Sequence, residues 1–506
     1  MTASSHSPPP AAPDVPARRT AAAPRARRVW RQDFAASLVV FLVALPLCVG
    51  VAVASGVPAE LGLVTGIVGG LVAGLMPGSS LQVSGPAAGL TVLVYEAVQE
   101  HGIGTLGVLV LAAGLLQTAM GLMRLGRWFR AISVAVVQGM LAGIGLVLIA
   151  GQLYAMADTP APAGGPAKFA GLPALVVGTA GSPAALTAAA LGVGTIAVLV
   201  LWPRLPGAAR LLPAPLVAVA LATAVAVVFD PPVARVDVRG LLASIQPPSG
   251  SDFARLAEFG VLGTVLAFTL IASAESLFSA AAVDRMHDGP RTDYDKELVA
   301  QGAGNAVCGA LGALPMTAVI VRSSANVRAG ARTKASRVLH GVWLLLFAAL
   351  VPAALGVIPL AALAGVLVHA GWKLVPVRAM VPLWREHRGE AVVLAATAVA
   401  IVATNLFEGV LVGLLLAVAK TAWDMSHVHV DVVDTGTGPI VVRLVGNATF
   451  LRLPKMLDTL ERLPADRPIE LDLTGLRHLD HACGTALGAW ADRHNEDGVD
   501  PVRVAV

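Results

Sequence analysis

The sequence predicts an α-helical polytopic membrane protein that carries a small α/β domain at its C-terminal end. Of its 506 residues, 56% are hydrophobic and 13% are charged, and the mean hydropathy is +0.75. Soluble domains are about 45–50% apolar and about 25% charged. Apolar blocks recur from about residue 34 to about residue 423, and a more polar, alternating pattern follows. This pattern excludes an ordinary soluble enzyme and predicts a membrane domain at 33–425 and a short domain at 426–506.

Residues 1–32 are rich in Pro, Ala and Arg and contain no apolar core followed by a small-residue cleavage site. We therefore expect a disordered, basic, cytosolic tail. The formal net charge is +4, but the cations cluster at the ends of apolar blocks and not along one soluble face. This distribution argues against a nucleic-acid partner.

Fourteen apolar blocks are candidates for membrane spans, because a helix needs roughly 20 apolar residues to cross a bilayer core about 30 Å thick. They are 34–54, 59–75, 86–100, 103–123, 129–151, 183–202, 211–229, 260–283, 296–313, 316–329, 338–354, 357–372, 389–405 and 407–423. With a cytoplasmic N-terminus, the loops on the cytoplasmic side hold sixteen Lys and Arg and the opposite loops hold four. This asymmetry follows the positive-inside rule. We expect a multi-pass protein of the plasma membrane with both termini in the cytoplasm.

The C-terminal segment has the pattern of alternating strands and helices. Residues 440–444 and 469–473 alternate in the manner of strands, 454–463 and 481–493 resemble helices, and 502–506 resembles a further strand. Parallel strands joined by helices form a compact layered domain. We expect a small cytosolic α/β domain here.

Two of the predicted spans are interrupted by proline. Pro86 follows the extended stretch that begins at Pro77, and Pro315 follows Gly312 in the tenth span. Proline is tolerated at the start of a helix but not in its interior, so we expect a short half-helix to begin at each proline. The two breaks lie in spans three and ten, which is the separation of a 7+7 inverted repeat. In such a repeat the two helix N-termini meet near the middle of the membrane.

The meeting point of two helix N-termini is suited to an anion, because unpaired N–H groups and the positive ends of the helix dipoles converge there. Arg322 adds a permanent positive charge in the tenth span, and Glu275 stands in the middle of the eighth. Ionisable groups at this depth indicate function. We expect Glu275 to be protonated, paired with Arg322 or bound to a cation. We expect Gln301 and Asn305 to join helices by hydrogen bonds and not to bind substrate.

These residues resemble the sulfate permease (SulP) family over about residues 33–423. The resemblance is carried by Ala44–Pro58, by Ser84–Pro86 and by Pro315–Asn326, and the C-terminal segment resembles the family's STAS domain. The resemblance implies a fourteen-span fold with core and gate halves, which moves anions by an elevator-like displacement, often as a homodimer. The anion pocket that it implies is lined by Leu47, Val51, Ala87, Ala88, Val321 and Arg322.

The family's coupling-ion position falls on Glu275, with Ser279 one turn later. Members of the family that bind sodium carry small and hydroxyl residues after the proline of the tenth span, whereas this chain has Ala318, Val319 and Ile320. The resemblance therefore leaves the backbone carbonyls of Ala318 and Ile320 as candidate ligands in place of side chains. Coupling to Na⁺ and coupling to H⁺ through Glu275 are both open.

The STAS-like segment departs from the phosphorylated members of its family. Asp480 is followed by His481, Ala482 and Cys483, where those members carry a serine after the aspartate. We therefore expect a role in assembly or trafficking and not a phosphoserine switch.

These residues and the family resemblance favour secondary active transport of bicarbonate, sulfate or a dicarboxylate. A passive anion channel, a nucleobase symporter and a receptor that signals through its tail remain alternatives, although Arg322 stands where a nucleobase symporter carries a carboxylate. The spans show neither a nucleophile with a nearby base nor an HExxH motif, so we do not expect an enzyme. The three cysteines lie far apart, and we expect neither a metal nor a cofactor.

Overall fold

The computed structural model describes residues 22–131, 133–206, 212–436, 438–464, 467–497 and 502–505. The chain divides into two compact units. The second unit comprises Ser133–Gly139, Arg378–Thr397 and the chain from Val410 onward, and the first comprises the remainder. Arg378–Thr397 and the chain from Val410 are thus grouped with the C-terminal domain, whereas Ala398–Gly409 belongs to the first unit. The domain boundary that we placed after residue 425 stays a prediction.

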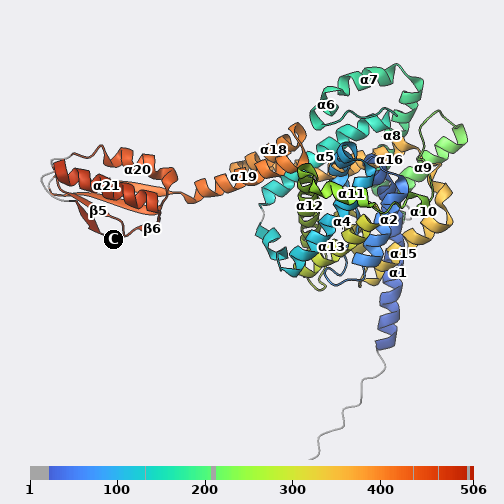
Figure 1. Ribbon diagram of the computed structural model, residues 1–506, viewed down its shortest axis with the longest axis horizontal. Coiled ribbons are helices and arrows are strands. Elements are labelled where there is room, and N and C mark those ends of the chain that lie inside the picture. The colour runs from blue at the N-terminus through green and yellow to red at the C-terminus, as the bar shows by residue number, and fades with distance from the viewer. Residues whose placement is uncertain are drawn as a thin grey trace, which may run out of the picture. The chain divides into compact units, whose positions relative to one another are not determined.

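The described part of the membrane domain is built from helices (Figure 1). Those up to residue 201 are α1 (Ala22–Ala54), α2 (Ala59–Val68), α3 (Thr91–His101), α4 (Ile103–Leu122), α5 (Val134–Met156), α6 (Gly165–Ala170), α7 (Leu172–Ala180) and α8 (Pro183–Leu201). Those after it are α9 (Ala214–Phe229), α10 (Leu241–Ser244), α11 (Gly250–Ala254), α12 (Phe259–Asp284), α13 (Tyr294–Ala310), α14 (Ile320–Arg328), α15 (Ala335–Leu350), α16 (Leu360–Leu374), α17 (Val377–Glu386), α18 (Arg388–Ala403) and α19 (Leu406–Met425). Short 3-10 or π turns, among them η1 (Gly69–Ala73) and η2 (Ala88–Leu90), extend or join them.

Each of the fourteen blocks that we predicted to span the membrane contains a helix. In the described residues, seven helices are long and apolar enough to cross a bilayer by themselves, and three shorter apolar helices accompany them. The long helices lie at Arg28–Ala54, Ile103–Leu122, Val134–Met156, Pro183–Arg204, Gly260–Asp284, Leu360–Glu386 and Leu406–Met425. The count of fourteen spans therefore stays a prediction, whereas the helical membrane architecture is confirmed.

The first helix begins earlier than we predicted. Residues 1–21 lie outside the described residues, but α1 begins at Ala22, so 22–32 is helical and not a disordered tail. This segment consists mainly of Ala and Arg, which have high helix propensities, and it continues directly into an apolar span. A helix that is already nucleated extends at little cost through such residues.

The prediction that half-helices begin at Pro86 and Pro315 is wrong in detail. Pro86 ends a short strand, β1 (Ser84–Pro86), and Pro315 immediately precedes another, β2 (Met316–Ala318). The helical turn after β1 begins at Ala88, and α14 begins at Ile320. The difference arises because each extended segment obtains its hydrogen bonds from the other and not from a helix.

The C-terminal domain is a five-stranded sheet with two helices. The alternating pattern predicted the two helices and three of the strands, but not β3 and β6. Its strands are β3 (Val428–Val433), β4 (Ile440–Ala448), β5 (Ile469–Asp472), β6 (Leu476–Leu479) and β7 (Arg503–Ala505). The strand order is β3-β4-β5-β7, with β6 also paired to β4, and only the β3–β4 pair is antiparallel. The helices α20 (Leu453–Leu460) and α21 (His481–Asp497) cover one face of the sheet (Figure 1). This α/β arrangement fits a STAS domain.

The core of the C-terminal domain follows from the two periodicities in its sequence. Ile440, Val442 and Leu444 alternate along β4 and are buried. Leu487 and Trp490 project from one face of α21 into the same apolar cluster. A strand of period two and a helix of period 3.6 thus bury one face each against the other.

Asp480 forms the cap of α21. Its Oδ1 accepts a hydrogen bond from the backbone N–H of Cys483 at 2.8 Å, and its Oδ2 accepts one from the N–H of Phe450 at 2.6 Å. The Cys483 N–H donor is the largest cause that lowers the pKa of the Asp480 carboxyl. Asp480 therefore stabilises the start of the helix in its ionised form.

We expect D480A to reduce the hydrogen-exchange protection of the α21 amides at pH 7. Because folding lowers the pKa of Asp480, its contribution is present above the carboxyl pKa of the unfolded chain, about 4, and is lost as the pH falls through the lower folded value. The difference between D480A and the wild type should therefore shrink below that range. D492A removes an exposed carboxylate from the same helix and is the control; an equal loss of protection in both variants would contradict the cap.

Candidate functional site

Two short strands bring the interrupted spans together. Ser84 pairs with Ala318, Gly85 with Thr317 and Pro86 with Met316, in an antiparallel register, and both strands are buried. Extended backbone within a membrane is tolerated only where its polar groups find partners inside the protein. The pairing supplies these partners and holds the two breaks at one place.

Side chains from α13 fix the two strands from one side. The Nε2 of Gln301 donates to Ser84 Oγ and to Glu297 Oε1, both at 2.7 Å. Asn305 receives a hydrogen bond from the N–H of Met316 at 2.7 Å and donates one to the Met316 carbonyl at 3.1 Å. The prediction that Gln301 and Asn305 join segments by hydrogen bonds is confirmed.

Further hydroxyl groups that the sequence analysis did not single out hold the strands from α12 and α14. Ser276 Oγ accepts from the N–H of Ala318 at 3.3 Å, and Ser323 Oγ accepts from the N–H of Val83 at 2.9 Å. Ser276 is adjacent to Glu275, and Ser323 is adjacent to Arg322. A serine beside an ionisable residue in an apolar span was the signal available for both.

Arg322 lies in the first turn of α14 with its whole side chain buried. Its Nη2 donates to the carbonyl oxygen of Pro86 at 3.1 Å, whereas Nε and Nη1 are buried and have no hydrogen-bond partner. The Nη1 atom lies against Gly85, in space that a Cβ atom would occupy. A buried cation with unused donors is costly unless a negative charge approaches it.

The other residues of the predicted pocket come from three elements that pack together. Leu47 and Val51 are buried on α1, Ala87 is buried ahead of η2, and Ala88 and Val321 are half-buried in the first turns of η2 and α14. Leu47 and Val321 belong to the same apolar cluster.

Two helical segments begin at the strands: η2, which continues directly into α3, and α14. None of the three elements has a side-chain cap at its N-terminus. The N–H groups of a first turn have no partner within the helix. Helical segments without side-chain caps therefore begin where the Arg322 guanidinium is buried.

Glu275 lies on α12 and packs against Gly89. Its Oε1 is 2.6 Å from the position that a Cβ atom at Gly89 would take, and its Oε2 is buried without a hydrogen-bond partner. Of the three states that we expected for Glu275, the structure does not show pairing with Arg322, because no ion pair in the described residues joins them. Arg322 packs on Gly85 whereas Glu275 packs on Gly89.

The remaining residues of the predicted coupling site differ in burial. Ser279 is buried one turn after Glu275, and Ala318 is buried at the end of β2. Ile320 is the first residue of α14 and is 38% exposed. In the part of the chain that the structure describes, no group of three His, Cys, Asp or Glu side chains could hold a metal ion. Any cation at this place would need backbone or hydroxyl oxygens besides Glu275.

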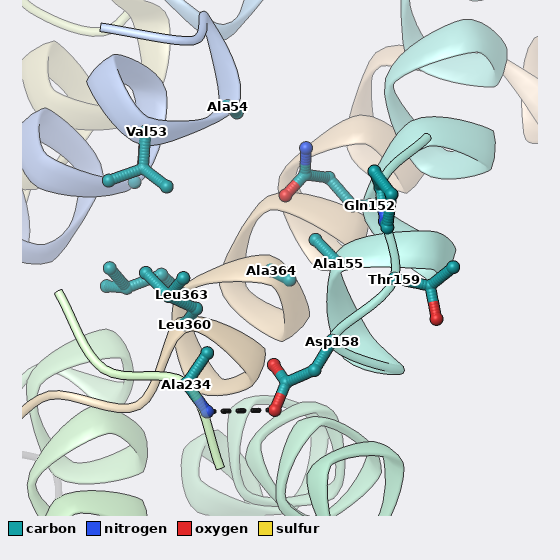
Figure 2. A pocket seen from close by; sticks show the side chains of 12 residues that line it. Val53, Ala54, Gln152, Ala155, Asp158, Thr159, Ala234, Leu360, Leu363 and Ala364 are labelled. Carbon is teal, nitrogen blue, oxygen red and sulfur yellow. Dashed lines mark hydrogen bonds between the residues drawn. The ribbon is translucent and has the colours of Figure 1, made fainter. Parts of the chain in front are cut away.

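A cavity of about 260 Å³ opens beside the C-terminal end of α1 (Figure 2). It lies between Val53 and Ala54 of α1, Gln152 of α5, and Leu360 and Leu363 of α16. The amide of Gln152 extends from α5 toward the side formed by α1 (Figure 2). The cavity thus reaches the segment of α1 that directly follows Leu47 and Val51.

We expect Q301A to destabilise the membrane domain. The change removes the donor to Ser84 and to the buried Glu297 carboxylate, and an unsatisfied buried group costs about 1–3 kcal/mol. The thermal midpoint of the purified protein should therefore fall clearly below that of Q99A, which truncates an exposed glutamine of α3. Equal midpoints for Q301A and Q99A would show that the network does not support the strands.

Comparison with solved structures shows that the fold is known. The transmembrane domain of a cyanobacterial bicarbonate transporter, BicA, is 24% identical, with a TM-score of 0.66, over 77% of this chain and 98% of that one. The structure of SLC26A9 is 15% identical, with a TM-score of 0.74, over 96% of this chain and 85% of that one. At these identities the likeness establishes the fold and the membrane architecture.

Comparison of sequences identifies the family. The putative sulfate transporter YvdB of Bacillus subtilis is 29% identical over 77% of this chain and 73% of its own length. The bicarbonate transporter BicA of Picosynechococcus is 27% identical over 80% of this chain and 72% of its own length. The family model for the sulfate permease family matches residues 30–397. With strands, half-helices and charged residues arranged as described, the chain belongs to the sulfate permease family of membrane anion transporters.

Proposed function

We propose that this protein is a secondary active transporter of a small inorganic anion, bicarbonate or sulfate. The observation that carries the proposal is the buried Arg322, whose Nε and Nη1 have no partner where two uncapped helical segments begin. Donors fixed before the ligand arrives bind an anion without a large cost of reorganisation. The names of the relatives YvdB and BicA, a sulfate and a bicarbonate transporter, favour these two substrates.

We place the coupling function at Glu275. Its carboxylate packs against Gly89, whereas Arg322 packs against Gly85, and its Oε2 has no hydrogen-bond partner. A proton or Na⁺ bound there would neutralise the carboxylate while an anion neutralises Arg322, so each ligand lowers the cost of moving the other through the membrane. Ser279 and the carbonyl groups of Ala318 and Ile320 are the further oxygen ligands that we propose for Na⁺.

An elevator-like movement is the transport mechanism that we propose. The strands, α12, α13 and α14 are joined by buried hydrogen bonds, including those of Gln301, Asn305 and Ser276. Such a network favours displacement of the site as one body against the helices that wall the cavity. We also propose a homodimer in the plasma membrane with both termini cytoplasmic.

Uptake into proteoliposomes tests the site. We expect R322Q to lower anion uptake about tenfold or more, because a hydrogen bond to a charged group contributes about 1.5–3 kcal/mol. E275Q should abolish the dependence on a Na⁺ or H⁺ gradient. The controls R239Q and E408Q remove exposed charges. If uptake by R322Q and E275Q is unchanged and still depends on the gradient, the assignment of these residues is refuted. A current that does not saturate with anion concentration would indicate a channel instead.

Ligand-dependent thermal stabilisation of the wild type distinguishes the substrates. Bicarbonate, sulfate, chloride, fumarate and uracil are compared with and without sodium, because a ligand that binds only the folded state raises the melting midpoint. A shift with sulfate or bicarbonate supports the proposal, and a shift with uracil alone favours a nucleobase symporter.

We expect G85A to impair uptake with little loss of stability. The added methyl group would occupy the space of Arg322 Nη1, which is the end of a flexible side chain and can move aside. The guanidinium would then be displaced from the anion. G263A is the matched control, because a Cβ atom at Gly263 meets nothing within 4 Å. Uptake by G85A equal to that of G263A would separate Arg322 from the transport site.

A further inference from the structure

A second, smaller hollow lies beside the larger cavity, and four polar side chains lie among the apolar residues that line it. It has a volume of about 50 Å³ and is walled by Thr91 and Tyr95 of α3, Gln152 of α5 and Lys168 of α6. Gln152 and Ala54 line both spaces. A space of roughly 10–15 Å³ holds one water molecule, so this hollow has room for one small inorganic anion.

Lys168 is a buried cation without an ion pair. Its residue is 5% exposed, and no carboxylate within the described residues lies within salt-bridge distance of its Nζ. The Nζ atom is 5.3 Å from the centre of the Tyr95 ring, whose face stabilises a cation in part. Burial lowers the pKa of the Lys168 ammonium, and the charge of Glu96 offsets this only partly. An anion beside Nζ would remove most of the cost of burying this charge.

Two further donors face the same space. Thr91 is the first residue of α3, and its Oγ1 is buried without a hydrogen-bond partner. Gln152 is 8% exposed and is among the residues that line the hollow. The position of Lys168 is fixed by its backbone, because Tyr154 of α5 donates a hydrogen bond from its hydroxyl to the Lys168 carbonyl at 2.8 Å. The cation is thus held in place over the hollow by α5.

We propose that this hollow is a second anion-binding site, in which Lys168, Thr91 and Gln152 hold a small inorganic anion between the bulk solution and Arg322. The inference rests on the proposed function, because the transported anion would bind in this hollow before it reaches the site at Arg322. Thr91 lies only three residues after Ala88, and Ala54 lies one turn after Val51, so the hollow adjoins the predicted pocket along both α3 and α1. Glu96 opposes the anion and limits its affinity, which suits a site that must release its ligand.

Transport kinetics test this site against the central one. We expect K168Q to raise the half-saturating anion concentration for uptake about three- to tenfold while retaining the maximal rate, because charge-assisted hydrogen bonds are lost at entry. K168R should retain most of the wild-type affinity, and E96Q should improve it. R239Q removes an exposed cation from the loop that also carries Ala234, which lines the larger cavity, and controls for general surface charge. Equal half-saturating concentrations for K168Q and R239Q would overturn the site.

Binding to the second site can be measured without transport. Sulfate and chloride should still raise the melting midpoint of R322Q, and the R322Q/K168Q double variant should lose this shift. K168Q alone, with the same midpoint as the wild type in the absence of anion, verifies that the fold is intact. No shift in R322Q would overturn the second site. If the wild type itself neither transports nor is stabilised by any of these anions, the proposed function fails, whereas wild-type transport that Lys168 does not affect removes only this inference.

Discussion

The pairing of β1 with β2 is the constraint on which the rest of this structure depends. Both strands are extended backbone in a membrane domain, where unpaired N–H and carbonyl groups cost several kcal/mol each, about 2–7. Pairing the strands satisfies these groups and at the same time brings the third and tenth predicted spans to one place. Arg322 and Glu275 lie near each other only because this pairing positions the segments that they contact. The chemistry of the site is therefore a consequence of satisfying the backbone.

The surrounding side chains follow from the same requirement. Gln301 and Asn305 supply donors and acceptors that a helix alone could not, and Ser276 and Ser323 complete the set. Each of these four residues makes at least one hydrogen bond to the segments around the strands, whereas the Nε and Nη1 of Arg322 make none.

Glycine determines how close the charged groups come to the backbone. At Gly85 and Gly89 a Cβ atom would collide with Arg322 and with the Glu275 carboxylate. Gly85 lies in β1 and Gly89 lies in η2, so one short segment of chain packs against the cation and against the carboxylate.

The sequence by itself determined the membrane class, a helix in every predicted block, the alternation of the C-terminal domain and the position of Arg322 and Glu275 within apolar spans. These follow from local hydrophobic periodicity and from the rarity of charge in apolar spans. Only the tertiary structure decided that Pro86 lies in a strand, because that strand's partner is more than 200 residues away. It also decided that Lys168, which the sequence presents as an ordinary loop cation, is buried against Tyr95. Burial and pairing between distant segments are non-local, and no pattern within a span encodes them.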